Sequence, residues 1–151
     1  MKVELVVNGE RYSVDVEPNE RLSDVLRSKL GYVSVKQGCG VGDCGLCIVL
    51  LDGKPVNSCL VLAYQAHGQS ITTVEGIGDD GKLHPLQQAF IDTGAVQCGF
   101  CIPAALLVLK HLYEMNPGAS RHEVRHALRS VLCRCGSYIR FEQAFEKVKK
   151  R

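Results

Sequence analysis

The first half of the chain alternates apolar and polar residues over short stretches, which is the pattern of half-buried β-strands. Asn8-Gly9-Glu10 separates two such stretches, and Asp52-Gly53 separates two others. Asparagine, aspartate and glycine tolerate the positive φ of tight turns, so both interruptions predict β-hairpins. The strands predicted in this half lie at residues 2–7, 11–16, 48–51, 55–59 and 71–74.

Helical spacing of apolar residues occurs once in this half and then dominates the second half. Residues 22–30 repeat apolar side chains at helical spacing, and Gly31 follows where helices commonly end. The glycine- and aspartate-rich stretch 76–82 predicts a linker. Ser120 and Glu123 form a capping box, which marks a helix start. The helices predicted beyond the linker lie near residues 84–92, 103–113, 120–131 and 138–149.

Together these elements predict an α+β protein with two domains. Residues 1–75 form a small mixed sheet crossed by one helix, in the manner of a β-grasp. Residues 76–82 form the linker, and residues 83–151 form a compact four-helix domain.

Composition narrows the class of protein. The chain has 151 residues, a formal net charge of +2, and 46% hydrophobic residues, which excludes a disordered acidic tail and a polybasic nucleic-acid arm. Aromatic residues make up 6%, too few for a base-stacking platform. No apolar run approaches the roughly 18 residues of a membrane span, and no secretion leader is visible. We therefore expect a cytoplasmic protein with no nucleic-acid partner and no membrane span.

Cysteine is the unusual residue, with eight in the chain. In a reducing cytosol this density favours metal ligation over disulfides. The cysteines divide evenly around the predicted linker, so each half holds one complete set of four thiolates. The first set is Cys39, Cys44, Cys47 and Cys59, and the second set is Cys98, Cys101, Cys133 and Cys135.

The first set opens with Cys39-x4-Cys44-x2-Cys47, which is the spacing of plant-type [2Fe-2S] ferredoxins. Glycines recur through this loop and let the backbone curl, so that N–H groups can point at sulfur. Cys59 ends the second predicted hairpin and can fold back over the loop. Structural zinc sites favour paired Cys-x2–4-Cys knuckles, so zinc is the weaker alternative here.

The second set consists of two close pairs at helix ends. Cys98 and Cys101 precede the helix that begins at Pro103, and Cys133 and Cys135 follow the capped helix. The positive end of a helix favours thiolates. By itself this set does not distinguish zinc from a [2Fe-2S] cluster. Beside a ferredoxin-type loop in the same chain, it predicts a second cluster.

Three segments carry a family resemblance. Residues 36–47 read Lys-Gln-Gly-Cys-Gly-Val-Gly-Asp-Cys-Gly-Leu-Cys, residues 97–101 read Gln-Cys-Gly-Phe-Cys, and residues 132–138 read Leu-Cys-Arg-Cys-Gly-Ser-Tyr. Together they resemble the small iron–sulfur subunit of the molybdenum hydroxylases, the family of xanthine dehydrogenase, aldehyde oxidoreductase and carbon monoxide dehydrogenase. The resemblance covers essentially the whole chain.

This resemblance implies a plant-type ferredoxin-like domain followed by a four-helix domain, with one [2Fe-2S] cluster in each. It implies an electron-transfer subunit of an oxidoreductase, with no catalytic residues of its own. Molybdopterin is then bound by a large partner subunit, and FAD commonly by a medium subunit. The substrate and the terminal acceptor are not encoded in this chain.

The resemblance also gives the two clusters a direction. The cluster of the helical domain is implied to lie nearer molybdenum, and the ferredoxin-type cluster nearer the flavin. Gln97 and Cys135 are the implied pterin contacts. The chain departs from the common family pattern at residues 101–104, where Cys-Ile-Pro-Ala replaces Cys-Thr-Pro-Gly, and at residues 136–137, where Gly-Ser replaces Thr-Gly. A zinc-stapled binding module and a stand-alone two-cluster ferredoxin are the alternative functions.

Overall fold

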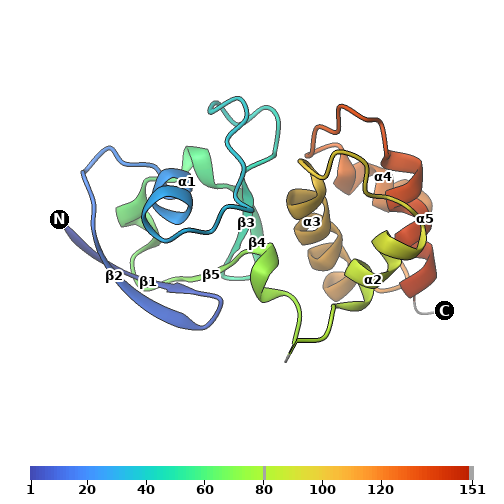
Figure 1. The fold of residues 1–151 in the computed structure, drawn as a ribbon, viewed down its shortest axis with the longest axis horizontal. Helices are drawn as coiled ribbons and strands as arrows, with labels where there is room; N and C mark the ends of the chain where they lie inside the picture. The colour runs from blue at the N-terminus through green and yellow to red at the C-terminus, as the bar shows by residue number, and fades with distance from the viewer. Residues whose placement is uncertain (80, 150–151) are drawn as a thin grey trace.

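The structure is a computed structural model that describes residues 1–79 and 81–149. Asp80 of the predicted linker, and Lys150 and Arg151 at the end of the predicted helical domain, lie outside the described residues. A sheet-containing lobe carries the N-terminus, and a helical lobe lies beside it (Figure 1). This arrangement is the α+β class that the sequence pattern predicts.

Five strands form one mixed sheet in the first lobe, in the order β2-β1-β5-β3-β4. Strands β1 and β5 pair in parallel, and the other neighbours pair antiparallel. The strands are β1 (Lys2–Val7), β2 (Glu10–Asp15), β3 (Ile48–Leu51), β4 (Lys54–Asn57) and β5 (Ser70–Thr72).

Both predicted hairpins are confirmed by their turns. Asn8 and Gly9 have φ of 51° and 85°, and Asp52 and Gly53 have φ of 47° and 79°. Two consecutive residues with positive φ match the right-handed twist of paired strands, which is why these residue types predict hairpins.

Two predicted strands end earlier than their apolar runs. The run 71–74 leaves the sheet because the Thr73 N–H donates to the Asn8 side chain at 2.9 Å instead of to a strand, and a short 3-10 helix, Val74–Gly76, follows. The run 55–59 ends its strand at Asn57, and a 3-10 helix, Ser58–Leu60, turns Cys59 toward Cys47.

The helix predicted at 22–30 is present with an unexpected second half. It begins as α1 (Leu22–Asp24) and continues as a π-helix, Val25–Lys29. The Leu30 N–H accordingly bonds the Val25 carbonyl, five residues back, at 3.0 Å. Gly31 ends the helix at a φ of 80°, in the role that the sequence predicts for it.

Four helices form the second lobe, as predicted. They are α2 (Pro85–Asp92), α3 (Ile102–Met115), α4 (Arg121–Leu128) and α5 (Tyr138–Val148). The capping box is confirmed at α4, where the Glu123 side chain accepts the Ser120 N–H at 2.7 Å. The prediction that this helix reaches 131 is wrong, because it ends at Leu128 and the chain turns toward the first lobe. Within the described residues, no helix has the length and apolar character to cross a membrane.

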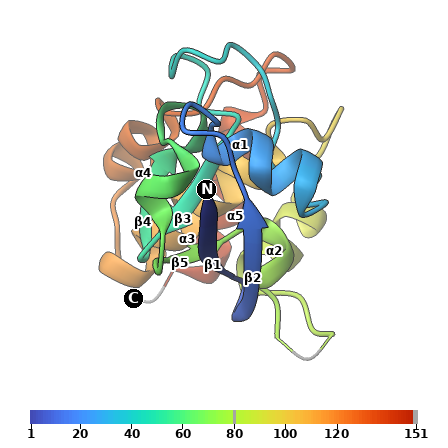
Figure 2. The same ribbon diagram turned by 90° about the vertical axis from the view of Figure 1, so that its left-hand side faces the viewer.

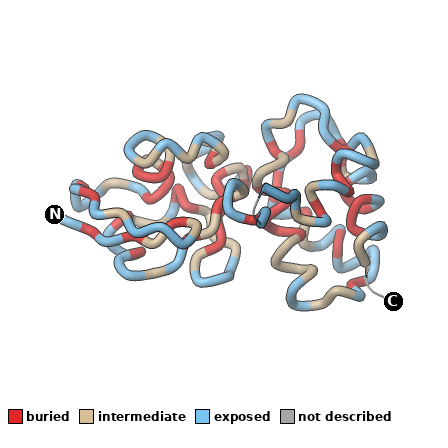
Figure 3. The backbone as a smooth tube through the Cα atoms, turned by 60° about the horizontal axis from the view of Figure 1, so that its bottom comes forward, coloured by how far each residue is buried: buried red, intermediate tan, exposed pale blue. Residues whose placement is uncertain are grey.

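Buried residues lie inside both lobes (Figure 3), and β3 contributes residues to both cores. Val49 packs in the sheet core beside residues such as Leu5. Ile48 and Leu50 pack in the helical core, whose largest members include Phe90. Successive strand residues face opposite sides of a sheet, so one short strand joins the two cores. The lobes are therefore held together by buried apolar contact.

Candidate metal centres

The cysteines of the first set surround one cavity of about 180 Å³ beside α1. Three of them come from the loop between the π-helix and β3, and Cys59 comes from the 3-10 helix after β4. Their side chains lie in hydrogen-bonded pairs, Cys39 with Cys44 and Cys47 with Cys59, and all four thiols are free. Nothing in residues 1–79 and 81–149 groups three His, Cys, Asp or Glu side chains around the position of a single ion.

Backbone N–H groups of the loop point at the sulfur of Cys39. Asp43 and Cys44 donate to it at 3.3 Å, and Val41 donates at 3.4 Å. Donors from Val41 and Cys44 lower the pKa of Cys39 to about 6, because they stabilise the thiolate. Burial has the opposite effect on Cys59 and raises its pKa to about 11. This cavity, the paired sulfurs and the inward N–H groups fit an anionic tetra-thiolate cluster.

Close packing explains two of the loop glycines. A Cβ at Gly38 would stand 2.7 Å from the sulfur of Cys44. A Cβ at Gly45, where φ is 67°, would stand 1.6 Å from the Ser130 carbonyl oxygen beyond α4. The absence of a side chain at Gly38 therefore leaves room for the sulfur of Cys44. The absence of a side chain at Gly45 leaves room for the backbone of the helical lobe.

The second set comes from two separate loops. Cys98 and Cys101 precede α3, and Cys133 and Cys135 lie between α4 and α5. The buried, free thiols of Cys101 and Cys133 are hydrogen-bonded to each other across these loops. Cys98 lines a groove of about 80 Å³ together with Cys101. Cys98 and Cys135 are exposed.

The pKa values of Cys101 and Cys133 are shifted in opposite directions. Burial, followed by the contact with Cys133, raises the pKa of Cys101 to about 12. Burial also acts on Cys133, but N–H donors led by Ser137, at 3.4 Å, outweigh it and lower the pKa of Cys133. Backbone N–H groups thus favour the thiolate form of Cys133, one of the two buried cysteines.

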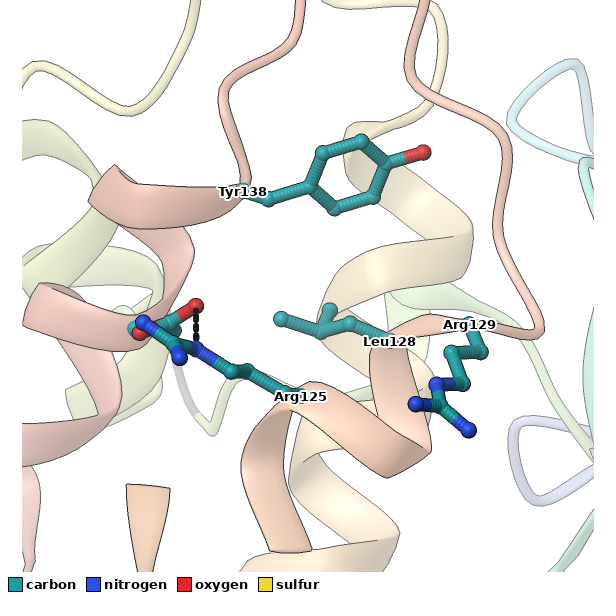
Figure 4. A pocket seen from close by; sticks show the side chains of 5 residues that line it. Arg125, Leu128, Arg129 and Tyr138 are labelled. Atoms are coloured by element: carbon teal, nitrogen blue, oxygen red, sulfur yellow. Dashed lines mark hydrogen bonds and ion pairs between the residues drawn. The ribbon is translucent and has the colours of Figure 1, made fainter. Parts of the chain in front are cut away.

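Tyr138 fixes the second loop, a role that the sequence pattern does not predict. Its hydroxyl accepts the Cys133 N–H at 2.7 Å and donates to the Val131 carbonyl at 2.9 Å. Its ring borders a pocket of about 320 Å³, with Arg125 and Leu128 of α4 on the other side (Figure 4). A tyrosine directly after a Cys-rich turn was the available signal.

Gln97, an expected pterin contact, is exposed beside the second set. Its amide donates to the Ser137 hydroxyl at 2.7 Å. Both residues line an open pocket of about 360 Å³, which Ile139 and Arg140 complete on the α5 side. Gln97 and the exposed Cys135 are therefore both accessible to a partner.

A hydrogen bond joins the two cysteine-bearing loops. The Leu132 N–H donates to the Cys44 carbonyl at 2.8 Å. Figures 1 and 2 show the loop before β3 and the loop between α4 and α5 on the same side of the molecule. The two sets thus lie in neighbouring loops although they belong to different lobes.

Comparison with known proteins identifies the family. Residues 5–73 match the "2Fe-2S iron-sulfur cluster binding domain" family, and residues 73–146 match the "[2Fe-2S] binding domain" family. The nicotinate dehydrogenase small FeS subunit of Eubacterium barkeri is 46% identical over 142 residues, covering 94% of this chain and 90% of that protein. The chain belongs to the small iron–sulfur subunits of the molybdenum hydroxylases.

Solved structures have the same fold as this iron–sulfur subunit over nearly its whole length. Quinoline 2-oxidoreductase from Pseudomonas putida 86 superposes with a TM-score of 0.93 at 42% identity, covering 96% of this chain and 90% of that chain. The aldehyde oxidoreductase of Desulfovibrio desulfuricans ATCC 27774 superposes with a TM-score of 0.92 at 44% identity, covering 98% of this chain but 17% of that larger chain. The predicted fold class, the two [2Fe-2S]-binding domains and the family are confirmed.

Proposed function

We propose that this chain is the electron-transfer subunit of a molybdenum-dependent hydroxylase or dehydrogenase. When bound, its two [2Fe-2S] clusters accept and release single electrons, between molybdopterin on a large partner subunit and FAD on a medium one. The observation that carries this function is the hydrogen bond from the Leu132 N–H to the Cys44 carbonyl, which joins one cysteine loop to the other. A chain built for transfer between two centres requires such a close connection.

We assign the eight cysteines as cluster ligands, four in each lobe. Each iron of a [2Fe-2S] core needs two protein ligands beside its two bridging sulfides, so thiolates are required in pairs. The sulfur pairs Cys39 with Cys44, and Cys47 with Cys59, meet this need in the first set. The second set is Cys98, Cys101, Cys133 and Cys135.

The residues between the two sets provide the transfer route. Leu132 precedes Cys133 in the chain, and its N–H is bonded to the Cys44 carbonyl. A ligand of one set is therefore linked to a ligand of the other through backbone atoms and one hydrogen bond. The missing side chain at Gly45 permits this approach, because Ser130 occupies the space of a Cβ.

We place the entrance for electrons at Gln97 and Cys135. Both are exposed beside the second set, and Ser137 holds the Gln97 amide in place. An amide both donates and accepts hydrogen bonds, which suits the edge of a pterin. The first set then faces the flavin subunit.

We also propose boundaries for the two domains and a cytoplasmic location for the protein. We retain residues 1–75, 76–82 and 83–151 as ferredoxin-like domain, linker and helical domain. Eight free cysteines are consistent with the reducing cytoplasm, where thiols remain available for iron.

Metal analysis of anaerobically purified protein tests the cluster assignment. We expect about four iron and about four acid-labile sulfide per chain, as two [2Fe-2S] clusters require. Stoichiometric zinc without labile sulfide would instead establish the zinc-stapled module.

Co-purification separates a subunit from a stand-alone ferredoxin. The tagged chain, expressed in its native host, is expected to bring down a larger protein that contains molybdenum and pterin. Recovery of the two-cluster chain alone, at a concentration where small subunits remain bound, would favour the stand-alone ferredoxin.

A further inference from the structure

A lysine of the first lobe is held against the cysteine loop of the second lobe. The Lys36 ammonium lies 5.6 Å from the centre of the Phe100 ring. Lys36 precedes the first set, whereas Phe100 stands between Cys98 and Cys101. A cation over an aromatic face at this distance is attracted by the ring's negative face. The charge of a first-lobe residue is thereby placed beside the second set.

Phe100, which Lys36 contacts, lies beside two thiols of the second set. Its ring lines the groove that Cys98 and Cys101 share, and Leu46 of the first loop closes the same groove. Lys36 itself is half-buried. Among the ion pairs of the described residues, none involves Lys36, so no carboxylate of these residues is paired with it.

Packing between the lobes keeps this lysine in place. The Leu132–Cys44 hydrogen bond and the contact of Gly45 with Ser130 fix the two loops relative to each other. Lys36 is on the same loop segment as Gly45, and Phe100 is in the same groove as Leu132. A free lysine would extend into water, where its charge is screened.

We propose that Lys36 sets the reduction potential of the cluster held by the second set, from the neighbouring domain. This inference rests on the proposed function. Two ferric ions, two sulfides and four thiolates carry a formal charge of about −2, and one added electron makes the cluster more negative. A nearby cation stabilises the reduced form more than the oxidised form, so it raises the potential. The reduction potential of the cluster in the helical domain then depends on how the two lobes pack against each other.

The test is a redox titration of the full-length protein with dithionite, followed by low-temperature EPR of each cluster. Lys36→Met removes the charge, and Lys36→Arg keeps it. Lys54→Met is the matched control, because Lys54 is an exposed lysine of the same lobe on β4. Phe100→Leu removes the ring and leaves the lysine.

We expect Lys36→Met to lower the ratio of reduced to oxidised second-set cluster, at a fixed potential, by about threefold to tenfold. This corresponds to about 30–60 mV for a one-electron couple. Lys36→Arg and Lys54→Met are expected to match the wild type. Phe100→Leu is expected to give a smaller shift in the same direction, and adding it to Lys36→Met is expected to change nothing further.

Equal shifts in Lys36→Met and Lys54→Met would overturn the proposal, and so would a shift confined to the first-set signal. Lys36→Gln carries the same expectation if the methionine variant does not load iron. Either contrary result leaves both EPR signals present, so the proposed function would survive it. Absence of iron–sulfur signals from the wild-type protein would instead refute the proposed function.

Discussion

The two cysteine sets are built in different ways. In the first set, a single loop supplies three cysteines and also the N–H groups that point at Cys39. In the second set, two loops at helix ends meet, and a hydrogen bond between the side chains of Cys101 and Cys133 joins one loop to the other. The first site is organised by local backbone geometry, whereas the second depends on the packing of the helices.

Their electrostatics differ accordingly. Five backbone N–H groups donate to sulfurs of the first set at 3.3–3.5 Å, whereas among the described residues the Ser137 N–H is the one such donor to a sulfur of the second set at this distance. Donors to sulfur favour the extra negative charge of a reduced cluster, and burial opposes it. We therefore expect the first-set cluster to have the higher reduction potential. Electrons entering at the second set would then move energetically downhill toward the first.

The largest effect is expected where the two regions touch. Gly45→Ala should destabilise the fold by about 3 kcal/mol or more, because its Cβ would overlap the Ser130 carbonyl oxygen at a positive φ. Gly53→Ala is the control, with a φ of 79° and open space around it, and should cost about 1–2 kcal/mol. Chemical denaturation measures both. Equal losses would show that the contact between the lobes contributes nothing.

Removal of one ligand from each set tests whether the clusters are independent. Cys44→Ala is expected to abolish one EPR signal and half of the iron, and Cys101→Ala the other signal and the other half. The local loop of the first set should leave the helical domain folded when its cluster is lost. Loss of both signals in either variant, with the fold intact by circular dichroism, contradicts the assignment of one cluster to each lobe.

A smaller effect is expected at Tyr138, which only the second set uses. Tyr138→Phe leaves the Cys133 N–H and the Val131 carbonyl without their partner, at a cost of about 1–3 kcal/mol. Iron release to a chelator should accelerate from the second set alone, as followed by its EPR signal. Tyr12→Phe removes a hydroxyl on β2 that bonds Glu10 and should change neither rate. Equal acceleration from both sets would contradict a local role.

The mildest test changes no residue. In metal-free protein, iodoacetamide should label Cys39 first near pH 7, because its pKa of about 6 leaves it mostly as thiolate. Its labelling rate should rise between pH 5 and 7 and then level off. Cys101, with a pKa of about 12, should stay unlabelled through this range. Peptide mass spectrometry measures both rates, and equal reactivity would show that the two environments do not differ.

Local patterns were sufficient for much of this protein. Asn8-Gly9 and Asp52-Gly53 predicted both hairpins because their φ preferences belong to the residues themselves. The Ser120–Glu123 capping box predicted the start of α4 for the same reason. The spacing of apolar residues did not predict where β5 ends. The strand ends because the Thr73 N–H donates to the side chain of Asn8, in the turn after β1.

Sequence by itself therefore determined the fold class, the division of the cysteines into two sets, and the family. The tertiary structure decided which groups meet: Cys101 with Cys133 within the helical lobe, and Leu132 with Cys44 and Lys36 with Phe100 between the lobes. The contacts between lobes join segments far apart in the chain, and no local preference specifies them. They arise when β3 buries Ile48 and Leu50 in the helical core and so brings the two cysteine loops together.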